Sequence, residues 1–322
     1  MKQRIIERRI NVNEFIYTVN YSEEDEELAE MELRAFFGSS ASGPVVKSSV
    51  DLDVNRSPFI REKVEVLLEA DSVADIVQKA GSIDIGSETF KAIFVKTNDL
   101  PPEKKVEYQE RLEIERAIGW EIIGEADLKN PDHLFGLVAC GGRWYLGRYE
   151  KNKRVWMKHI QKPREYSTAL SARDARVMAN IAVPEPEGIR AVDPCCGIGT
   201  VLVEALSMGM DIEGRDINPL VVGGSRENLA YFGLEGCVTL GPIEEVEEHY
   251  DVAIIDMPYN LYTHATPDEL QSILTHARRI ADRLVVVSID PIEEMVEKAG
   301  FAIQDRCIAR KSTFSRRILS CS

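Results

Sequence analysis

The stretch of residues 189–208 constrains the fold of this chain more than any other. A mostly apolar run ends at Asp193, a turn with Gly197 and Gly199 follows, and an apolar helical pattern begins at Thr200. The glycines permit a tight turn and leave room where a Cβ would intrude on a ligand. The free N–H groups at the start of the helix favour an anionic group. The segment therefore predicts a strand, a ligand-binding turn and a helix.

Strands and helices alternate through the rest of this half of the chain. Strands are expected at residues 211–217, 238–240, 250–255, 284–288, 301–309 and 316–321, and helices at 172–181, 201–208, 267–279 and 291–299. This alternation predicts a parallel sheet that is covered by helices on both faces.

The glycine turn differs from the dinucleotide-binding fingerprint, which needs a third small residue where Leu202 stands. Asp216 ends the second predicted strand, 23 residues beyond Asp193. A carboxylate about 20 residues after such a turn accepts ribose hydroxyl groups in doubly wound folds. The alternative is that Asp216 only caps the helix that starts near Pro219.

A second motif, Asp256-Met257-Pro258-Tyr259, follows four apolar residues that are typical of a strand buried on both faces. Ligands of such sheets bind beyond the carboxyl ends of the strands. Asp256 and the glycine turn are therefore expected to face one crevice. The alternative is a buried Asp that caps a loop and a Tyr in the core.

Together the two motifs resemble those of amino-methyltransferases with an (Asp/Asn)-Pro-Pro-(Tyr/Phe) motif. More narrowly, the chain resembles the THUMP-containing tRNA guanine-N2 methyltransferases, and this similarity extends to residues 130–138, 162–167, 171–176 and 311–318. The resemblance implies a Rossmann-like methyltransferase sheet, mostly parallel with its last strand antiparallel, and S-adenosyl-L-methionine as the methyl donor.

The resemblance also implies roles for individual residues. Asp256 would accept the hydrogens of a guanine amine, Pro258 would shape the backbone and Tyr259 would stack on the base. The residues expected to bind the donor are Asp193, Cys195, Gly197, Gly199, Thr200, Asp216, Ile217 and Ser167.

Three positions depart from the family pattern. Met257 replaces the first proline of the motif, and a methionine there can still pack against a base. Pro242 stands where the family usually has an Asp that contacts adenine, so a backbone carbonyl or Glu244 is expected to substitute. Asn260 replaces a glycine and tolerates left-handed backbone better than most residues.

The amino half predicts an α+β accessory domain. Strands are expected at residues 15–19 and 90–95, helices at 23–37, 58–68 and 104–118, and a hairpin turn at Gly141-Gly142. The resemblance implies a ferredoxin-like segment followed by a THUMP segment. The predicted organisation is an RNA-binding domain at 1–160, a linker and leading helix at 161–188, and a methyltransferase domain at 189–322.

The net charge of −15 argues against a generally basic nucleic-acid-binding surface. Two local clusters of basic residues partly answer this objection. In the first, Glu150 is the only acidic residue between Arg143 and Arg164. The candidate RNA-binding residues are Arg148, Lys151, Lys153, Arg154, Lys158, Arg310, Lys311 and Arg316. The alternative is a solvated hairpin and a basic joint between domains.

Other classes of protein have less support. No apolar run approaches the roughly 18 residues of a membrane span, and the amino terminus does not resemble a secretion signal. Six cysteines without a C-x-x-C pair predict neither a zinc site nor a disulfide framework. A cytoplasmic protein that binds no metal is expected, and the sequence gives no indication of its oligomeric state.

The leading hypothesis is an enzyme that flips a guanine out of a structured tRNA and methylates its exocyclic amine. One alternative is an amino-methyltransferase that acts on rRNA, DNA or a protein glutamine. An alternative of another class is an RNA-binding protein that binds the donor but does not transfer the methyl group.

Overall fold

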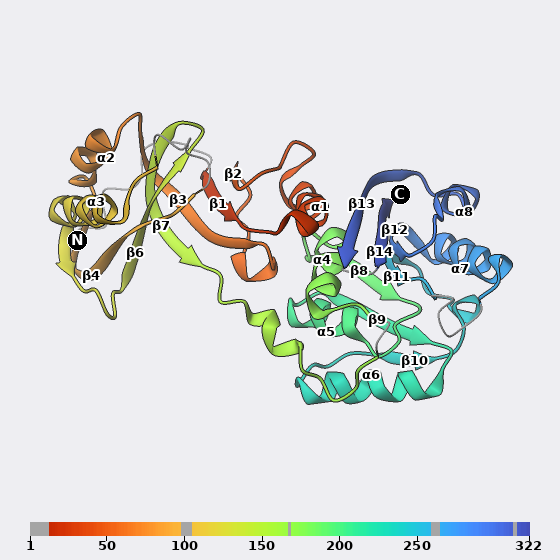
Figure 1. Cartoon of the computed structure of the whole chain (residues 1–322). Coiled ribbons are helices and arrows are strands. Elements are labelled where there is room, and N and C mark those ends of the chain that lie inside the picture. The colour runs from red at the N-terminus through yellow and green to blue at the C-terminus, as the bar shows by residue number, and fades with distance from the viewer. Residues whose placement is uncertain (1–12, 98–104, 167–168, 259–264, 312–313) are drawn as a thin grey trace. The chain divides into compact units, whose positions relative to one another are not determined.

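The computed structural model describes residues 13–97, 105–166, 169–258, 265–311 and 314–322 (Figure 1). The chain forms two compact units. The first, here called the amino unit, comprises Met1–Asn20, Ala41–Val54 and Ile60–Lys153. The second, the carboxyl unit, comprises Tyr21–Ser40, Asn55–Phe59 and Arg154–Ser322.

The amino unit is built on one seven-stranded sheet. Its strand order is β2 (Val45–Ser48), β1 (Phe15–Val19), β3 (Ile60–Ala70), β7 (Arg143–Lys151), β6 (His133–Cys140), β4 (Asp84–Phe94) and β5 (Ile123–Ala126). Helices α2 (Val73–Ala80) and α3 (Tyr108–Glu121) pack on it through an apolar cluster that includes Ile76, Phe90 and Ile118. The mixture of strands and helices agrees with the predicted α+β class.

The carboxyl unit contains the second seven-stranded sheet. Its order is β10 (Val238–Leu240), β9 (Asp211–Asp216), β8 (Arg190–Asp193), β11 (Tyr250–Asp256), β12 (Ala281–Ser288), β14 (Phe314–Cys321) and β13 (Ile303–Lys311). Only the last strand of the chain, β14, runs antiparallel to its neighbours in this sheet. The predicted Rossmann-like arrangement is therefore confirmed.

Helices cover both faces of this sheet (Figure 1). On one face α4 (Ala172–Ala182), α5 (Thr200–Ser207) and α6 (Pro219–Tyr231) pack against one another in that order. On the other face α7 (Pro267–Ile280) and α8 (Glu293–Lys298) lie over β11, β12 and β13. Helices α4, α5, α7 and α8 begin and end within about two residues of the predicted positions, whereas no end was predicted for α6.

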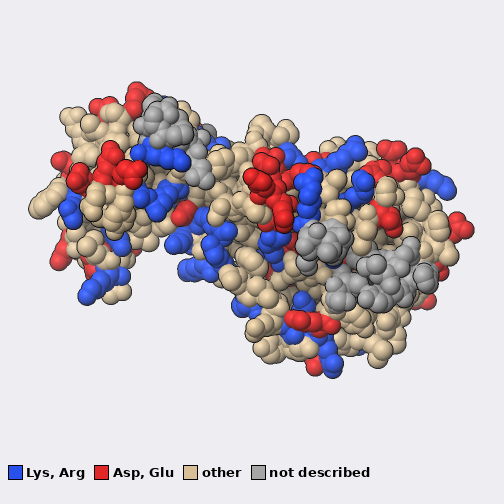
Figure 2. Space-filling view, viewed as in Figure 1, with Lys and Arg blue, Asp and Glu red and all other residues tan. Residues whose placement is uncertain are grey.

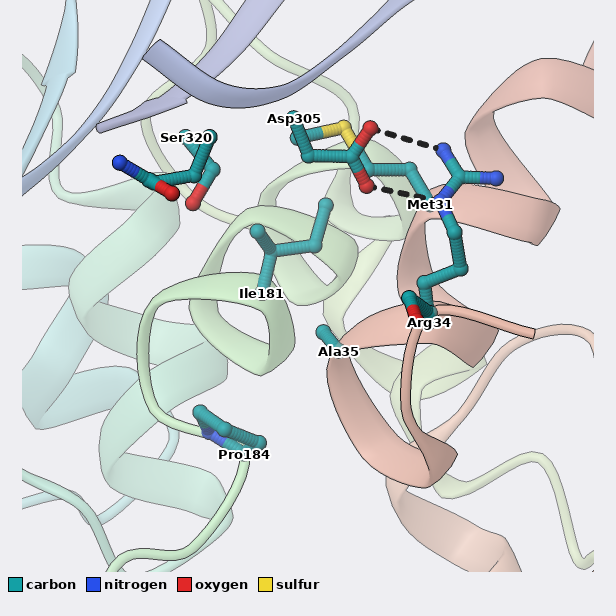
Figure 3. Close-up of a pocket in the computed structure, with 9 residues that line it drawn as sticks. Met31, Arg34, Ala35, Ile181, Pro184, Asp305 and Ser320 are labelled. Carbon is teal, nitrogen blue, oxygen red and sulfur yellow. Dashed lines mark hydrogen bonds and ion pairs between the residues drawn. The ribbon is translucent and has the colours of Figure 1, made fainter. Parts of the chain in front are cut away.

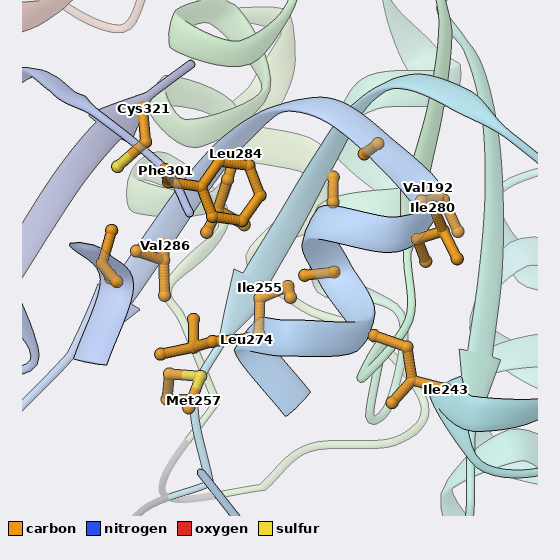
Figure 4. Packing of buried hydrophobic residues seen from close by; sticks show 14 of the residues in the cluster. Val192, Ile243, Ile255, Met257, Leu274, Ile280, Leu284, Val286, Phe301 and Cys321 are labelled. Atoms are coloured by element: carbon orange, nitrogen blue, oxygen red, sulfur yellow. The ribbon is translucent and has the colours of Figure 1, made fainter. Parts of the chain in front are cut away.

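The alternation of side chains along β11 determines which of them lie in the hydrophobic core. Ala253, Ile255 and Met257 join an apolar cluster with Leu274 of α7. Figure 4 shows Ile255 and Met257 on the side of the sheet that faces α7. Because successive side chains of a strand point to opposite faces, Asp256 points to the face that α4 covers.

Helix α1 (Glu26–Phe37) belongs to the carboxyl unit although it lies near the start of the sequence. It packs against α4 and β13 and buries Leu28 and Met31 completely. The carboxyl unit is therefore assembled from segments that are not contiguous in the sequence. Amphipathic periodicity identifies a helix but does not say which distant element its apolar face will meet.

Buried polar groups fix the two short insertions in the carboxyl unit. Glu32 of α1 accepts hydrogen bonds from Ser57 Oγ at 2.5 Å and from Asn180 Nδ2 of α4 at 2.7 Å. Burial raises the pKa of Glu32 to about 7, although these two hydrogen bonds lower it. A buried carboxyl group costs free energy unless it is hydrogen-bonded, so these partners specify how α1 docks.

A buried ion cluster ties the linker after the amino unit to α4 and α5. Glu204 of α5 accepts a hydrogen bond from Arg176 Nη1 of α4 at 2.7 Å, and His159 Nδ1 lies 2.8 Å from its other oxygen. Arg176 also donates to the carbonyl oxygens of Asn55 and Arg56. All three charged or titratable side chains are almost fully buried.

Two predictions in the amino unit had different outcomes. The predicted helix at residues 58–68 is wrong, because this segment is β3 and Val64 pairs with Ile16 on one side and Tyr149 on the other. The four-residue spacing of Ile60 and Val64 suits a helix, but pairing on both edges overrides that local preference. The predicted hairpin is confirmed, and its two glycines have the positive φ angles, 55° and 77°, that its turn requires.

Candidate active site

The glycine turn connects β8 to α5 and is shaped for a ligand. Gly197 and Gly199 have φ angles of 52° and 75°, which other residues adopt only with strain. A Cβ at Gly199 would lie 2.2 Å from Ser225 Oγ, so packing requires glycine there. A Cβ at Gly197 would meet nothing within 4 Å. Gly197 therefore borders open space at the amino end of α5.

Two predicted acidic residues flank this turn. Asp193 is 3% exposed and its Oδ1 accepts a hydrogen bond from the Cys195 amide at 3.2 Å. Asp216 accepts from the Gly197 amide through Oδ2 and from the Asn218 amide through Oδ1, both at 2.9 Å. Asp216 thus fixes the turn from the end of β9. The cap of α6 is Asn218, whose side chain accepts from the Leu220 amide, so the alternative role for Asp216 as that cap does not hold.

The acceptor motif ends the strand next to β8. Val192 pairs with Ala253, so Asp193 and Asp256 terminate adjacent parallel strands at one edge of the sheet. The chain continues from β8 to β9 on one side and from β11 to β12 on the other. This is the topological switch point at which open α/β sheets bind ligands.

Charges at this edge act on one another. Burial raises the pKa of Asp193 well above its usual range, and the negative charges of Asp216 and Asp256 raise it further against the hydrogen bond from Cys195. Burial likewise raises the pKa of the Cys195 thiol, again with Asp256 among the contributing charges. The two motifs therefore share one electrostatic environment.

Asp256 has an environment that holds a proton near neutral pH. Burial raises the pKa of Asp256 to about 8, the positive charge of Arg316 lowers it, and the negative charge of Asp174 raises it. Asp174 belongs to the first turn of α4, where its amide is capped by Ser171 Oγ at 3.1 Å. A carboxyl group that titrates near the operating pH suits proton transfer.

Arg316 was predicted to bind RNA, but it is only 4% exposed. It lies on β14, where the neighbouring Arg317 pairs with Ser288 at the carboxyl end of β12. Because side chains alternate along a strand, Arg317 reaches Glu293 of α8 on one face and Arg316 points to the face that carries Asp256. A doublet of arginines in the sequence does not show which of the two is buried.

Met257 also differs from the expectation. Its side chain is 2% exposed and fills the core beside Leu274, so it does not offer a surface to a base (Figure 4). Pro258 is partly buried. Tyr259, Asn260 and Ser167 lie outside the described residues.

The part of this sheet edge next to β9 contains the predicted substitutes for the missing acidic residue. The Pro242 carbonyl oxygen accepts a hydrogen bond from Arg215 Nε at 2.9 Å, and Glu244 accepts one from Ser272 Oγ at 3.3 Å. Ile217 follows Asp216 and is 71% exposed.

The candidate RNA-binding residues have varied environments. Arg148 forms an ion pair with Glu65, and Arg310 forms one with Glu27. Exposed side chains belong to Lys151, Lys153, Arg154 and Lys158. Figure 2 shows basic and acidic side chains interspersed over the viewed face. The side chain of Lys311 is not among those described.

A cavity of about 350 Å³ lies elsewhere in the carboxyl unit, between α1, α4 and the β13–β14 hairpin. The ion pair between Arg34 and Asp305, with N–O distances of 2.8 and 3.1 Å, lies on its wall (Figure 3). None of the predicted site residues lines this cavity.

Within the described ranges, no three His, Cys, Asp or Glu side chains are grouped so that they could hold a metal ion. In that same part of the chain, no helix has the length and apolar character that crossing a bilayer requires.

Comparisons with known proteins place this site in context. Residues 160–284 match the family model described as UPF0020, RMKL-like, methyltransferase domain. A tRNA (guanine(10)-N2)-dimethyltransferase of Methanothermobacter thermautotrophicus is 31% identical over 160 residues, which cover 46% of this chain and 47% of that protein. The human U6 snRNA (guanine-N(2))-methyltransferase THUMPD2 is 28% identical over 179 residues, which cover 52% of this chain and 33% of that protein. The chain therefore aligns with half or less of the length of these relatives.

A solved structure of TrmN from Thermus thermophilus covers 96% of this chain and 99% of its own, with 16% identity and a TM-score of 0.47.

Proposed function

Since residues 160–284 match the family model of UPF0020, RMKL-like, methyltransferase domains, we propose that the chain methylates the exocyclic amine of a guanosine in tRNA. The donor in this proposal is S-adenosyl-L-methionine. The observation that carries the proposal is the position of Asp256, which ends β11 beside the glycine turn and titrates near neutral pH.

The residues around the glycine turn fit the donor. Gly197 borders open space, and Thr200 Oγ1 is buried with no hydrogen-bond partner in the described part of the chain. A buried hydroxyl group without a partner costs about 1–3 kcal/mol, so a ligand that bonds to it would recover that cost. In the proposal, Asp193, Cys195, Gly197, Gly199 and Thr200 hold the methionine part.

The other end of the donor would lie along β9. Asp216 uses each oxygen for one backbone amide, and a carboxylate oxygen can accept a further hydrogen bond. We assign this capacity to the ribose hydroxyl groups and the exposed face of Ile217 to the adenine ring. Arg215 already bonds to the Pro242 carbonyl oxygen, which adenine would have to share, whereas Ser272 bonds to only one of the two carboxylate oxygens of Glu244.

Asp256 would prepare the guanine amine for reaction. S-adenosylmethionine, when bound, supplies an electrophilic methyl group on a sulfonium. The lone pair of the amine is delocalised into the ring, and a carboxylate that accepts the amine hydrogens localises it toward that methyl group. Once the methyl group had passed from the sulfonium to the nitrogen, Asp256 would take the proton that the amine loses. Its pKa of about 8 suits this role.

The remaining residues of the motif complete the assignment. Pro258 would shape the loop and Tyr259 would stack on the flipped base, as the resemblance implies. Flipping a base costs a few kcal/mol, which contacts to the RNA backbone would offset. The amino unit, proposed to be ferredoxin-like and THUMP-like, and the exposed cations Lys151, Lys153, Arg154 and Lys158 would make these contacts in a cytoplasmic enzyme.

The decisive experiment is methyl transfer from labelled S-adenosylmethionine to total unmodified tRNA, followed by nucleoside analysis. Labelled N2-methylguanosine is expected. Asp256→Ala should abolish transfer and leave donor affinity nearly unchanged. Donor binding without any labelled tRNA would refute the proposed substrate, and joint loss of donor binding and transfer in Asp256→Ala would make Asp256 a structural residue.

The similarity to a methyltransferase named for U6 snRNA motivates a second candidate substrate. The same assay with a U6 snRNA transcript separates the two, because the preferred RNA should be labelled at the lower enzyme concentration.

A further inference from the structure

The segment that enters the carboxyl unit combines exposed apolar and basic side chains. Helix η4 (Val155–His159) and the residues after it expose Val155, Met157, Ile160 and Tyr166, the last at 54%. Arg154, Lys158 and Lys162 alternate with them in the sequence. Apolar or aromatic platforms interleaved with cations are typical of surfaces that bind single-stranded nucleic acid.

A cavity of about 360 Å³ lies in this segment. Its wall includes Trp156, Ile160, Lys162 and Tyr166 from the linker and Ser171 and Arg173 at the start of α4. The volume falls within the roughly 300–1,000 Å³ of small-molecule sites. The amino end of α4 also carries Asp174, whose charge acts on Asp256. The start of α4, which lines the cavity, is therefore within electrostatic range of the acceptor carboxylate.

Two polar groups of this cavity have no partner in the described residues. Trp156 Nε1 is buried and makes no hydrogen bond there, and no ion pair engages Lys162. Burial lowers the pKa of Lys162, whereas the charges of Glu165 and Glu204 raise it. Arg173, by contrast, is paired with Asp25 at 2.7 Å and Asp174 at 3.2 Å.

We propose that this cavity binds one unpaired nucleotide of the RNA next to the target guanosine. Tyr166 and Trp156 would contact the base, the Trp156 N–H would donate to an oxygen of the nucleotide, and Lys162 would contact a phosphate. This inference rests on the proposed RNA substrate but concerns binding, not transfer.

Charge distinguishes this occupant from the methyl donor. S-adenosylmethionine carries a positive sulfonium, a positive ammonium and one carboxylate, so its net charge is positive and Lys162 would repel it as a whole. A phosphate has the opposite preference. Glu165 is the only acidic residue among the described residues that line the cavity, and its side chain is exposed.

The test uses the full chain and measures RNA affinity by fluorescence anisotropy with an unmodified tRNA transcript at several salt concentrations. Tyr166→Ala should weaken binding about 5- to 150-fold if a base stacks there. Lys162→Gln should reduce the slope of log affinity against log salt by about 0.7. Trp156→Phe keeps an aromatic ring and removes the N–H. RNA affinity should therefore fall two- to tenfold, which corresponds to the loss of about one hydrogen bond.

Matched controls are available in the same unit. Tyr231 at the end of α6 is 64% exposed, and Lys298 at the end of α8 is exposed as well. Both helices run from the carboxyl to the amino edge of the sheet, so Tyr231→Ala and Lys298→Gln should leave RNA affinity unchanged. Circular dichroism and thermal unfolding of every variant establish that it is folded.

Calorimetry with S-adenosylmethionine completes the test. Unchanged donor affinity together with weakened RNA affinity is expected. If the three variants lose donor affinity instead, or if RNA binding does not differ from that of the controls, the inference is overturned. Failure of the wild-type protein to methylate a tRNA that it binds would refute the proposed function and leave the binding site standing.

Discussion

Asp256 yields a prediction about the pH dependence of catalysis. Its pKa is raised to about 8, so about one tenth of the protein has an ionised Asp256 at pH 7 and about nine tenths at pH 9. If the ionised carboxylate accepts the amine hydrogens, the single-turnover rate should rise about ninefold over that interval. The rate should level off above about pH 9.

The positive charge of Arg316 lowers the pKa of Asp256. Removal of a nearby opposite charge raises a carboxyl pKa by about one unit or more, so Arg316→Gln should reduce the ionised fraction of Asp256 at pH 8 from about one half to about one tenth. We expect a rate loss of about fivefold at pH 8 that higher pH recovers. Arg316→Lys keeps the charge and should restore most of the rate.

The adjacent arginine supplies the control. Arg317 pairs with Glu293 on the opposite face of β14, so Arg317→Gln should leave the pH profile in place. Single-turnover rates with saturating donor and tRNA are measured from pH 6 to pH 9.5. A flat wild-type profile, or a shift of the Arg316→Gln profile to lower pH, would refute the assigned roles of both residues.

The same titration must affect stability. Between the ordinary aspartate pKa, about 4, and about 8, the folded protein keeps a proton on Asp256 that the unfolded chain has released. The contribution of Asp256 to the free energy of unfolding is therefore lost as pH rises through this window. Asp256→Asn removes that loss, so its advantage over wild type in urea unfolding should grow from pH 4 to pH 8 and then stay constant.

Three further predictions concern the donor turn and the buried polar clusters. Gly197→Ala and Gly209→Ala both place a Cβ in open space at positive φ, so each should cost about 1–2 kcal/mol of stability, but only Gly197→Ala should weaken S-adenosylmethionine binding by calorimetry. Glu204→Ala leaves the guanidinium of Arg176 buried without its carboxylate. The free energy of unfolding, measured in urea, should fall by about 3–5 kcal/mol. A fall of less than 1 kcal/mol would mean that water replaces the carboxylate. Burial raises the pKa of Glu32 to about 7, so wild-type stability should fall from pH 4.5 to pH 7, and Glu32→Gln should flatten that slope.

Much of the carboxyl unit could be predicted because its rules are local or topological. Buried apolar runs locate strands, and the alternation with helices makes them parallel. Parallel strands bring Asp193 and Asp256 to one edge without further information. The resemblance to guanine-N2 methyltransferases, which rested on these motifs, is confirmed by the family match and the curated relatives.

The remaining features depend on pairings that the sequence does not display. Arg316 meets Asp256 only because β14 inserts beside β12 in a particular register, and a shift of one residue would expose it. Met257 is in the core because it follows Asp256 on a strand whose odd-numbered positions face α7. The segment at residues 58–68 became a strand because partners lay on both sides of it.

The docking of α1 has a consequence for the order in which the protein can be completed during synthesis. Arg34 in α1 binds Asp305 in β13, 271 residues later. At about 5–20 residues per second, a ribosome needs roughly 15–50 s to make the intervening chain. Until β13 is made, only α4 is available to cover the apolar face of α1 that carries Leu28 and Met31. We therefore expect nascent chains that stop before β13 to be held by chaperones through the α1 segment.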